Sequence, residues 1–322
     1  MSASALALPR RNTPARRRAQ RRRRLLILGL MSPWLVGFCI FFGYPLVYSV
    51  YLSFTHYDLL SSPRWIGTAN YDFMLHGDPN VGPAVRNTLW LIAIAVPLQI
   101  VFAIATATLL TKPRKGVKVY RTLYFLPAIA PIVAGSLAFL FLFNPAYGPI
   151  NKFLSGIGIG KPPTWFYSPG SSKWALVILA LWGIGEAMII FLAGLLDVPR
   201  HLYEAADIEG GSAWQKFRHV TLPMITPVIF FSLVIGVIQA FQYFTQAYVA
   251  STTLGGQRSS LGAPQNSLLF YSIYLFQQGF SYFRMGYASA MAWVLFIITM
   301  ICTLVLIKTS NRWVHYQGGM FK

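Results

Sequence analysis

The sequence predicts an all-α membrane protein that crosses the bilayer six times, with both termini in the cytoplasm. Three observations support this fold class. Hydrophobic residues make up 55% of the 322 residues and charged residues only 11%, whereas a soluble domain has roughly a quarter charged residues. Six stretches are long and apolar enough to span the hydrocarbon core, and the basic residues are concentrated on alternate connecting segments.

A transmembrane helix needs about 20 apolar residues, and each stretch reaches that length. The predicted spans are Leu25–Ser53, Thr88–Leu110, Leu123–Phe143, Trp174–Leu196, Val228–Ala250 and Tyr287–Ile307. The second, third and fourth contain helix breakers, namely Pro97, Pro127 with Pro131, and Gly183 with Gly185. Membrane helices tolerate such residues where neighbouring helices or cavity water satisfy the freed backbone groups.

The segment before the first span, residues 1–24, contains nine arginines. We expect a disordered cytoplasmic tail that anchors the chain and contacts anionic lipid headgroups. Nucleic-acid binding is the alternative interpretation, but no aromatic residues alternate with the arginines, so no nucleic-acid partner is predicted. The following apolar run is about twice as long as a signal-peptide core and lacks a small-residue cleavage site, which predicts that it stays in the membrane.

Charge determines the predicted orientation. With the amino terminus inside, the inner segments hold 20 of the 27 Lys and Arg residues and the outer loops hold 7, as the positive-inside rule requires. The predicted organisation is the tail 1–24, a six-helix membrane domain over 25–310, and a short cytoplasmic tail over 311–322. Cys39 and Cys302 lie within apolar runs and are interpreted as small hydrophobic residues.

Sequence signals for catalysis are missing. The nearest match to a phosphate-binding loop, Gly156 to Pro162, lacks the first Gly and has Pro162 where Ser or Thr would bind magnesium. The five histidines are scattered without metal-ligand spacing. We therefore expect no metal or cofactor in this chain and no enzymatic activity. If ATP is used, another subunit hydrolyses it.

The inner segment between the fourth and fifth spans, residues 198–223, is predicted to form two short helices. The first is followed by Gly210-Gly211, and the second is capped at Ser212 and ends before Pro223. Such a helix-turn-helix at the membrane surface suits the groove of a soluble partner. The alternative is an amphipathic loop lying on the headgroups, which its acidic residues disfavour because the inner leaflet is itself negative.

This segment resembles the EAA loop of ABC importer permeases. The matching positions are Glu204-Ala205-Ala206, then Gly210, then Val220-Thr221-Leu222-Pro223 at the family's spacing. The resemblance implies that the segment is a coupling helix held in a cleft of the ATPase. It assigns the coupling surface to Glu204, Ala205, Ala206, Asp207, Gly210, Leu222 and Pro223. Within it, Glu204 would pair with a basic residue of the ATPase, Gly210 would make the turn, and Leu222-Pro223 would restart the next span.

Further motifs extend the resemblance over roughly residues 30–310 and favour the sugar-type, MalF-like permeases. Among them are Gly67-Thr68-Ala69-Asn70-Tyr71, Asn87-Thr88 and Gly286-Tyr287-Ala288-Ser289-Ala290. The resemblance implies import of carbohydrates or glycerol-phosphate compounds across a bacterial cell membrane. The implied partners are a second, homologous permease in a heterodimer, an ABC ATPase dimer that binds ATP and magnesium, and an extracytoplasmic substrate-binding protein.

Two groups of residues are candidates for the substrate pathway. Gln239, Gln242, Tyr243 and Gln246 would share one face of a continuous fifth helix. Such amides both donate and accept hydrogen bonds, as sugar hydroxyls require, although contacts between helices would explain them equally well.

The second group lies on the fourth span, where Glu186 is a carboxyl within a membrane helix and therefore a functional candidate. Trp182, one turn earlier, could stack on a sugar ring, and Gly183 would permit close packing beside it. Pairing of Glu186 with a polar group of a partner permease is the alternative. An ion-coupled secondary transporter remains the competing function, with Glu186 as its one coupling carboxylate, and a membrane-embedded enzyme is a third possibility.

Overall fold

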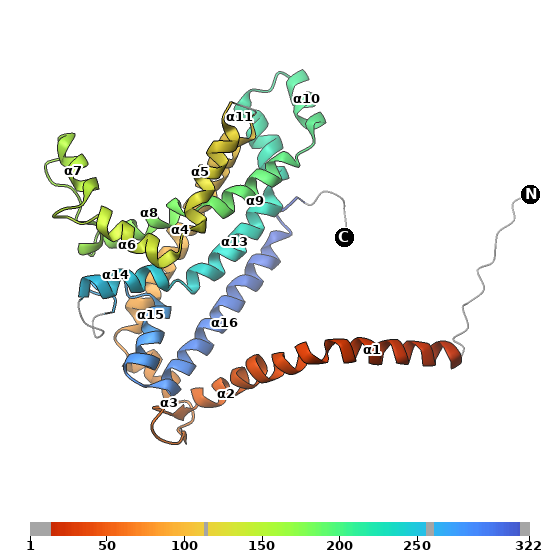
Figure 1. The fold of residues 1–322 in the computed structure, drawn as a ribbon, viewed down its shortest axis with the longest axis vertical. Helices are drawn as coiled ribbons and strands as arrows, with labels where there is room; N and C mark the ends of the chain where they lie inside the picture. Colours follow the sequence, from red (N-terminus) through yellow and green to blue (C-terminus); the bar gives the residue numbers. More distant parts are fainter. Residues whose placement is uncertain (1–13, 113–114, 256–260, 316–322) are drawn as a thin grey trace, which may run out of the picture. The chain divides into compact units, whose positions relative to one another are not determined.

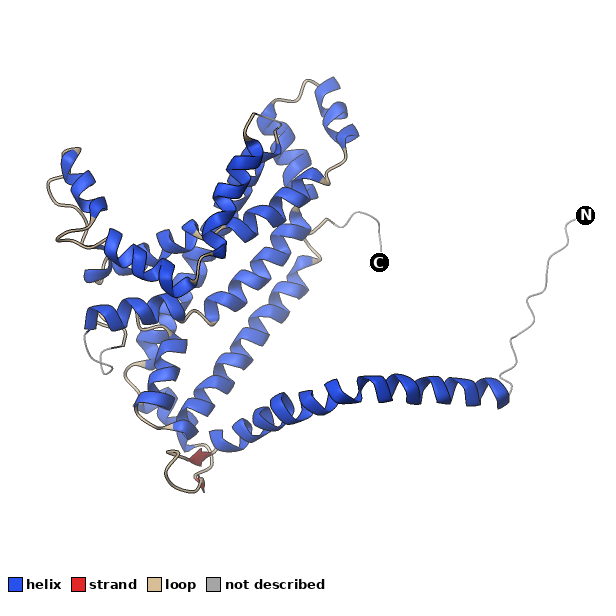
Figure 2. Ribbon diagram, viewed as in Figure 1, coloured by secondary structure: helices blue, strands red, loops and turns tan. Residues whose placement is uncertain are grey.

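The computed structural model describes residues 14–112, 115–255 and 261–315. The chain divides into two compact units, Met1–Leu52 and Ser53–Lys322, and each is described by itself. Helices make up nearly all of the regular structure (Figure 2). The all-α prediction is therefore confirmed for the described residues.

The first unit is one helical segment that continues through a π-helical turn. It consists of α1 (Pro14–Phe38), the π turn Cys39–Gly43 and α2 (Tyr44–Ser53) (Figure 1). The stretch Leu25–Ser53 has the length and hydropathy of a membrane span, as predicted. However, α1 begins at Pro14, so residues 14–24 are helical rather than disordered, in line with the high helix propensity of Ala and Arg. Residues 1–13 of the predicted tail lie outside the described residues.

Two spans of the second unit are unbroken helices. They are α4 (Val81–Thr111) and α16 (Met285–Ser310), and both extend beyond the predicted apolar stretches. Pro97 lies inside α4 without ending it. The helices α9 and α13, introduced below, both pack against α4.

Three spans are broken into two helices each. α5 (Val117–Ile129) and α6 (Ile132–Leu142) meet at 99°, and α8 (Ser172–Trp182) and α9 (Gly185–Leu196) meet at 50°. The fifth predicted span contains α13 (Thr226–Phe241) and α14 (Thr245–Gly255), between which the chain changes direction (Figure 1). With α13 and α14 counted together as Thr226–Leu254, the described residues contain four apolar helical stretches of spanning length, or six if each of the other two bent pairs is one span.

The first of these breaks has a local cause. Pro131 has no N–H group and forces the preceding residue out of the helical region, and Ala130 accordingly has an extended conformation (φ −66°, ψ 137°). Pro127 remains within α5.

Short elements connect the spans. β1 (Thr55–His56) pairs antiparallel with β2 (Arg64–Trp65), with Thr55 opposite Trp65. The remaining elements are α3 (Ala69–Asp72), the π turn Phe73–Gly77, α7 (Pro149–Gly156), the 3-10 turn Trp165–Tyr167, α10 (Arg200–Ile208), α11 (Ala213–Lys216), the π turn Phe217–Thr221, α12 (Leu222–Met224), α15 (Tyr271–Phe276) and the π turn Gln277–Ser281.

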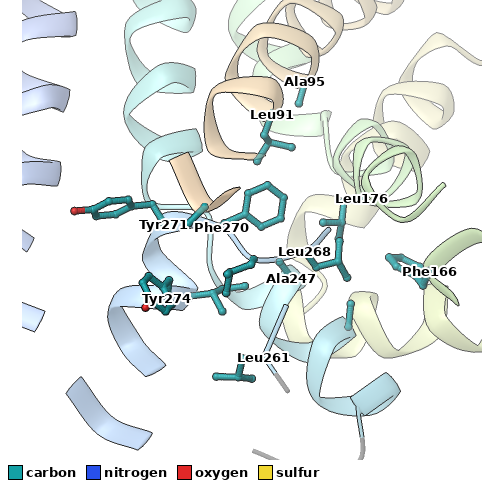
Figure 3. Close-up of a cluster of buried hydrophobic side chains, with 14 of the residues drawn as sticks. Leu91, Ala95, Phe166, Leu176, Ala247, Leu261, Leu268, Phe270, Tyr271 and Tyr274 are labelled. Atoms are coloured by element: carbon teal, nitrogen blue, oxygen red, sulfur yellow. The ribbon is translucent and has the colours of Figure 1, made fainter. Parts of the chain in front are cut away.

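The largest buried cluster joins α4, α8, α14 and α15. Figure 3 shows Leu91, Leu176, Ala247 and Phe270 within it. A buried polar side chain, Asn87 at the start of α4, holds the segment before α15 in place.

Asn87 makes three hydrogen bonds. Its Nδ2 donates to the carbonyl oxygens of Asn266 at 2.7 Å and Leu269 at 3.0 Å. Its Oδ1 accepts from Lys173 Nζ at 2.9 Å. The hydroxyl of Thr88, the next residue, accepts from the N–H of Tyr271 at 3.0 Å. The Asn87-Thr88 motif therefore fastens one long connection to the second and fourth spans.

The described part of the carboxyl-terminal tail packs back onto the fifth span. The Trp313 ring meets Phe230 edge-on, with centroids 6.0 Å apart. The backbone N–H of His315 donates to Thr226 Oγ1 at 2.9 Å.

Candidate functional site

A cavity of about 480 Å³ lies where the three broken spans meet α4. Its lining includes the breaks themselves, at Pro131, Gly183 and Gln242. All seven predicted substrate-pathway residues line this cavity: Trp182, Gly183, Glu186, Gln239, Gln242, Tyr243 and Gln246. The two groups from different spans therefore belong to one site, and their role in binding substrate remains a prediction.

The expectation that the fifth-span residues share one face of a continuous helix is wrong. α13 ends at Phe241, and the helix resumes at Thr245. Ser272 Oγ of α15 donates to the Tyr243 carbonyl oxygen at 2.5 Å, which satisfies a backbone acceptor that the break leaves free. The break, rather than helical periodicity, brings these side chains to the cavity.

The Tyr243 side chain has an unusual environment. Its ring meets Phe270 edge-on at a centroid distance of 5.5 Å. Its hydroxyl oxygen is buried and has no hydrogen-bond partner among the described residues. Such a group costs free energy unless water or a ligand pairs with it.

Trp182 forms an aromatic wall at the end of α8. Its ring lies 5.4 Å from that of Phe139, and a Cβ added to Gly135 would come within 3.1 Å of it. The indole is 42% exposed. It therefore offers an open ring face of the kind on which a sugar ring can stack.

The prediction that Gly183 permits close packing beside Trp182 is wrong. A Cβ there would meet only the Ala180 carbonyl oxygen, at an ordinary 3.7 Å. The close approach is at Gly185 instead, where an added Cβ would lie 2.7 Å from the carbonyl oxygen of Tyr124. Gly185 is the glycine that lets α9 pack on α5.

Glu186 lies in the first turn of α9 and is exposed. Its carboxylate forms no ion pair or hydrogen bond with any residue that the structure describes.

Gln99 of α4 also lines the cavity and was not among the predicted pathway residues. Gln99 could have been identified because it is an amide within an apolar span, like the glutamines of the fifth span. With it, four glutamines surround the cavity.

The prediction of two short helices joined at Gly210-Gly211 is confirmed by α10 and α11. α10 ends in a Schellman motif: the N–H of Gly210 donates to the Asp207 carbonyl at 3.1 Å, and that of Gly211 to the Ala206 carbonyl at 2.8 Å. Gly210 has φ +73°, which a glycine adopts without strain. The predicted turn is therefore at Gly210.

The second helix starts at the predicted cap. The N–H of Gln215 donates to Ser212 Oγ at 3.3 Å, and the N–H of Ser212 donates to Gln215 Oε1 at 2.7 Å, forming a capping box. The prediction that this helix ends before Pro223 is wrong. The chain continues through the π turn Phe217–Thr221 into α12, where Pro223 occupies the first turn and needs no N–H partner.

Apolar and acidic groups are exposed together on this loop. Ile208 is 89% exposed and Trp214 is 66% exposed, with its ring stacked on Phe217 at 5.7 Å. Glu204 and Ala205 are exposed as well. Asp207 pairs with Lys216 at 2.5 Å, which ties the first helix to the second.

No group of three or more His, Cys, Asp or Glu side chains capable of holding a metal ion occurs within the described ranges. The residues of the loop 198–223 and the cavity residues lie on different parts of the chain, which are connected by α9 and by α12 with α13.

The profile of a family described as "Binding-protein-dependent transport system inner membrane component" matches residues 99–316. The probable ABC transporter permease protein YesP of Bacillus subtilis (strain 168) is 41% identical over 94% of this chain and 95% of its own length. The arabinooligosaccharides transport system permease protein AraP of the same organism is 32% identical over 87% of each chain.

Solved structures share the fold. A crystal structure of a bacterial ABC transporter involved in the import of the acidic polysaccharide alginate matches with a TM-score of 0.75 and 22% identity. The match covers 92% of this chain and 99% of that one. At this level of identity the likeness concerns the arrangement of helices.

Proposed function

Because this chain belongs to the family of inner-membrane components of binding-protein-dependent transport systems, we propose that it forms half of the pathway for ATP-driven carbohydrate uptake. It is a multi-pass transporter subunit and not an enzyme. Family membership also rules out the two competing functions, the ion-coupled secondary transporter and the membrane-embedded enzyme.

The observation that carries the carbohydrate assignment is the lining of the cavity. Four glutamines and a tyrosine supply donors and acceptors, and Trp182 supplies a ring face. Sugars require both, because their hydroxyls form hydrogen bonds and their C–H faces stack on aromatic rings. Relatives whose names include arabinooligosaccharides, lactose and sulfoquinovosyl glycerol support the same substrate class.

The loop 198–223 is proposed to receive the ATPase. Exposed apolar side chains beside acidic ones favour docking into a protein groove over lying on a negative membrane surface. In this proposal Glu204 pairs with a basic residue of the ATPase, and the Asp207–Lys216 pair with the Gly210 turn keeps the two short helices in one arrangement. Leu222 and Pro223 pass the displacement to α13.

The same proposal includes the remaining partners. They are a second, homologous permease, an ATPase dimer that binds ATP and magnesium, and an extracytoplasmic binding protein that delivers the substrate. The inner position of both termini follows from the distribution of Lys and Arg.

Uptake of labelled oligosaccharides by the complete transporter, produced with its genomic neighbours, tests the substrate assignment. Gln242→Leu removes an amide from the cavity, and we expect it to lower uptake at least several-fold while the complex still assembles. Gln242→Asn, which retains the amide, is the matched control and should keep most of the activity. If uptake and the stimulation of ATP hydrolysis are both unchanged in Gln242→Leu, these glutamines only make contacts between helices and do not bind the substrate.

A further inference from the structure

The charge of the cavity points to a narrower substrate class, an inference that rests on the proposed function. We infer that Glu186 makes the cavity a filter against anionic saccharides, so that this permease passes uncharged, hydroxyl-rich sugars and repels sugar acids.

Glu186 is the one Asp, Glu, Lys or Arg among the described residues that line the cavity. The other polar side chains there are neutral: the four glutamines, Thr245 and Tyr243. A carboxylate without a compensating cation makes the local potential negative.

Glu186 is not neutralised by any residue that the structure describes. Its carboxylate has neither an ion-pair partner nor a hydrogen-bond donor among the residues described. Among the described residues the ion pairs are His76–Asp72 and Lys216–Asp207, and neither includes a cavity residue. The charge therefore acts on whatever enters the cavity.

An anionic sugar in the cavity would be repelled by Glu186. Two like charges roughly 8 Å apart at an effective dielectric constant of about 20 repel enough to lower occupancy by on the order of tenfold or more. A sugar carboxylate in this cavity of about 480 Å³ would also lose hydration without gaining a cationic partner. Both the charge repulsion and the lost hydration therefore disfavour entry of sugars that carry a carboxylate.

A neutral sugar can instead form hydrogen bonds with the Glu186 carboxylate. A carboxylate accepts hydrogen bonds only, and two neighbouring hydroxyls can donate to its two oxygens. Hydrogen bonds to an ionised acceptor are stronger than those between neutral groups. Glu186 therefore discriminates in both directions, by attraction of hydroxyls and repulsion of anions.

The sign of the potential can be measured without knowing the substrate. Thr245→Cys places a near-isosteric thiol in the lining, in a chain in which Cys39 and Cys302 are replaced by alanine. In the complete transporter in nanodiscs, the rates of modification by cationic and anionic methanethiosulfonate reagents are compared, each divided by its rate with a free thiol. We expect the cation to be favoured, and Glu186→Gln to reduce that preference by about tenfold.

Asp197→Asn, which removes an exposed acid that does not line the cavity, is the matched control and should leave the preference unchanged. If Glu186→Gln leaves the preference unchanged as well, then a partner subunit neutralises Glu186 and the inference is wrong.

A transport measurement connects the potential to substrate choice. ATP-driven uptake is compared for galactobiose with digalacturonate and for cellobiose with cellobiouronic acid, using pairs of which the binding protein captures both members. We expect the neutral member to enter at least tenfold faster, and Glu186→Gln to slow its entry while admitting the acid. Equal uptake of both members by the unmodified transporter would overturn the filter and leave the proposed carbohydrate function intact. If the unmodified transporter takes up none of these saccharides, although the thiol at position 245 still reacts preferentially with the cationic reagent, the carbohydrate function would be overturned instead.

Discussion

Gly185 lies directly against the backbone of Tyr124, so that a Cβ built on Gly185 would come within 2.7 Å of the Tyr124 carbonyl oxygen. The same atom would be 2.9 Å from Phe125 Cα. Because backbone atoms form this contact, no rotation of a side chain can relieve it. The beginning of α9, and with it Glu186, is therefore positioned by its contact with α5.

Gly185→Ala should separate α9 from α5 and destabilise the folded permease by about 1–3 kcal/mol, the usual cost of overpacking. Thermal unfolding in detergent, followed by fluorescence, measures the change. Gly183→Ala is the control, since its Cβ would make only an ordinary 3.7 Å contact, and its unfolding temperature should stay close to that of the unmodified protein. Equal effects of the two substitutions would contradict this packing.

Asn87→Leu should destabilise the protein by about 2–3 kcal/mol, because it removes the hydrogen bonds that Asn87 makes with the Leu269 carbonyl oxygen, the Asn266 carbonyl oxygen and Lys173 Nζ. Hydrogen exchange should show loss of protection in the segment before α15. Asn311→Leu changes an exposed asparagine and is expected to be nearly neutral. Retained protection in Asn87→Leu would show that the hydrophobic cluster alone holds this segment.

Tyr274 of α15 should make the stability of the folded protein depend on pH. Its hydroxyl donates to both carboxylate oxygens of Asp78, at 2.8 and 2.7 Å. Burial first, and then the hydrogen bond and charge of Asp78, raise the pKa of Tyr274 above its ordinary value of 10.0. The unfolded chain therefore releases this proton at lower pH than the folded protein does.

The stability from Tyr274 should accordingly be complete below pH 10 and be lost progressively as the pH rises beyond it. Tyr274→Phe should cost about 1.5–3 kcal/mol at neutral pH, since a hydrogen bond to a charged group is removed. The variant should also lose less stability than the unmodified protein between neutral and alkaline pH. Parallel pH profiles for the two proteins would mean that other groups cause the alkaline loss.

Hydropathy and turn residues predicted where helices occur. Each predicted apolar stretch is helical over most of its length, and Ser212 and Gly210 cap the helices where their side-chain and backbone chemistry requires. These features depend on neighbouring residues in the sequence, so a single sequence contains them.

The breaks that form the cavity were less predictable. Pro131 interrupts a span whereas Pro127 and Pro97 lie inside helices, so the presence of a proline does not by itself predict a break. The break at Gln242 has no proline or glycine, and its backbone is satisfied by Ser272, which is remote in the sequence. The assignment of close packing to Gly183 rather than Gly185 failed for the same reason, since the contact is with another helix.

The central claim is that a separate ATPase drives this permease through the loop 198–223, and Glu204→Arg tests it most directly. The complete transporter is purified through the permease, and the amount of co-purified ATPase and the rate of ATP-driven uptake in proteoliposomes are measured. Asp197→Arg makes the same change of charge at an exposed acid outside α10 and is the control. We predict that Glu204→Arg lowers both quantities by at least about tenfold, as expected for a reversed charge at a paired interface position, and that the control leaves both near their original values. ATPase association and uptake that both survive Glu204→Arg would contradict the claim.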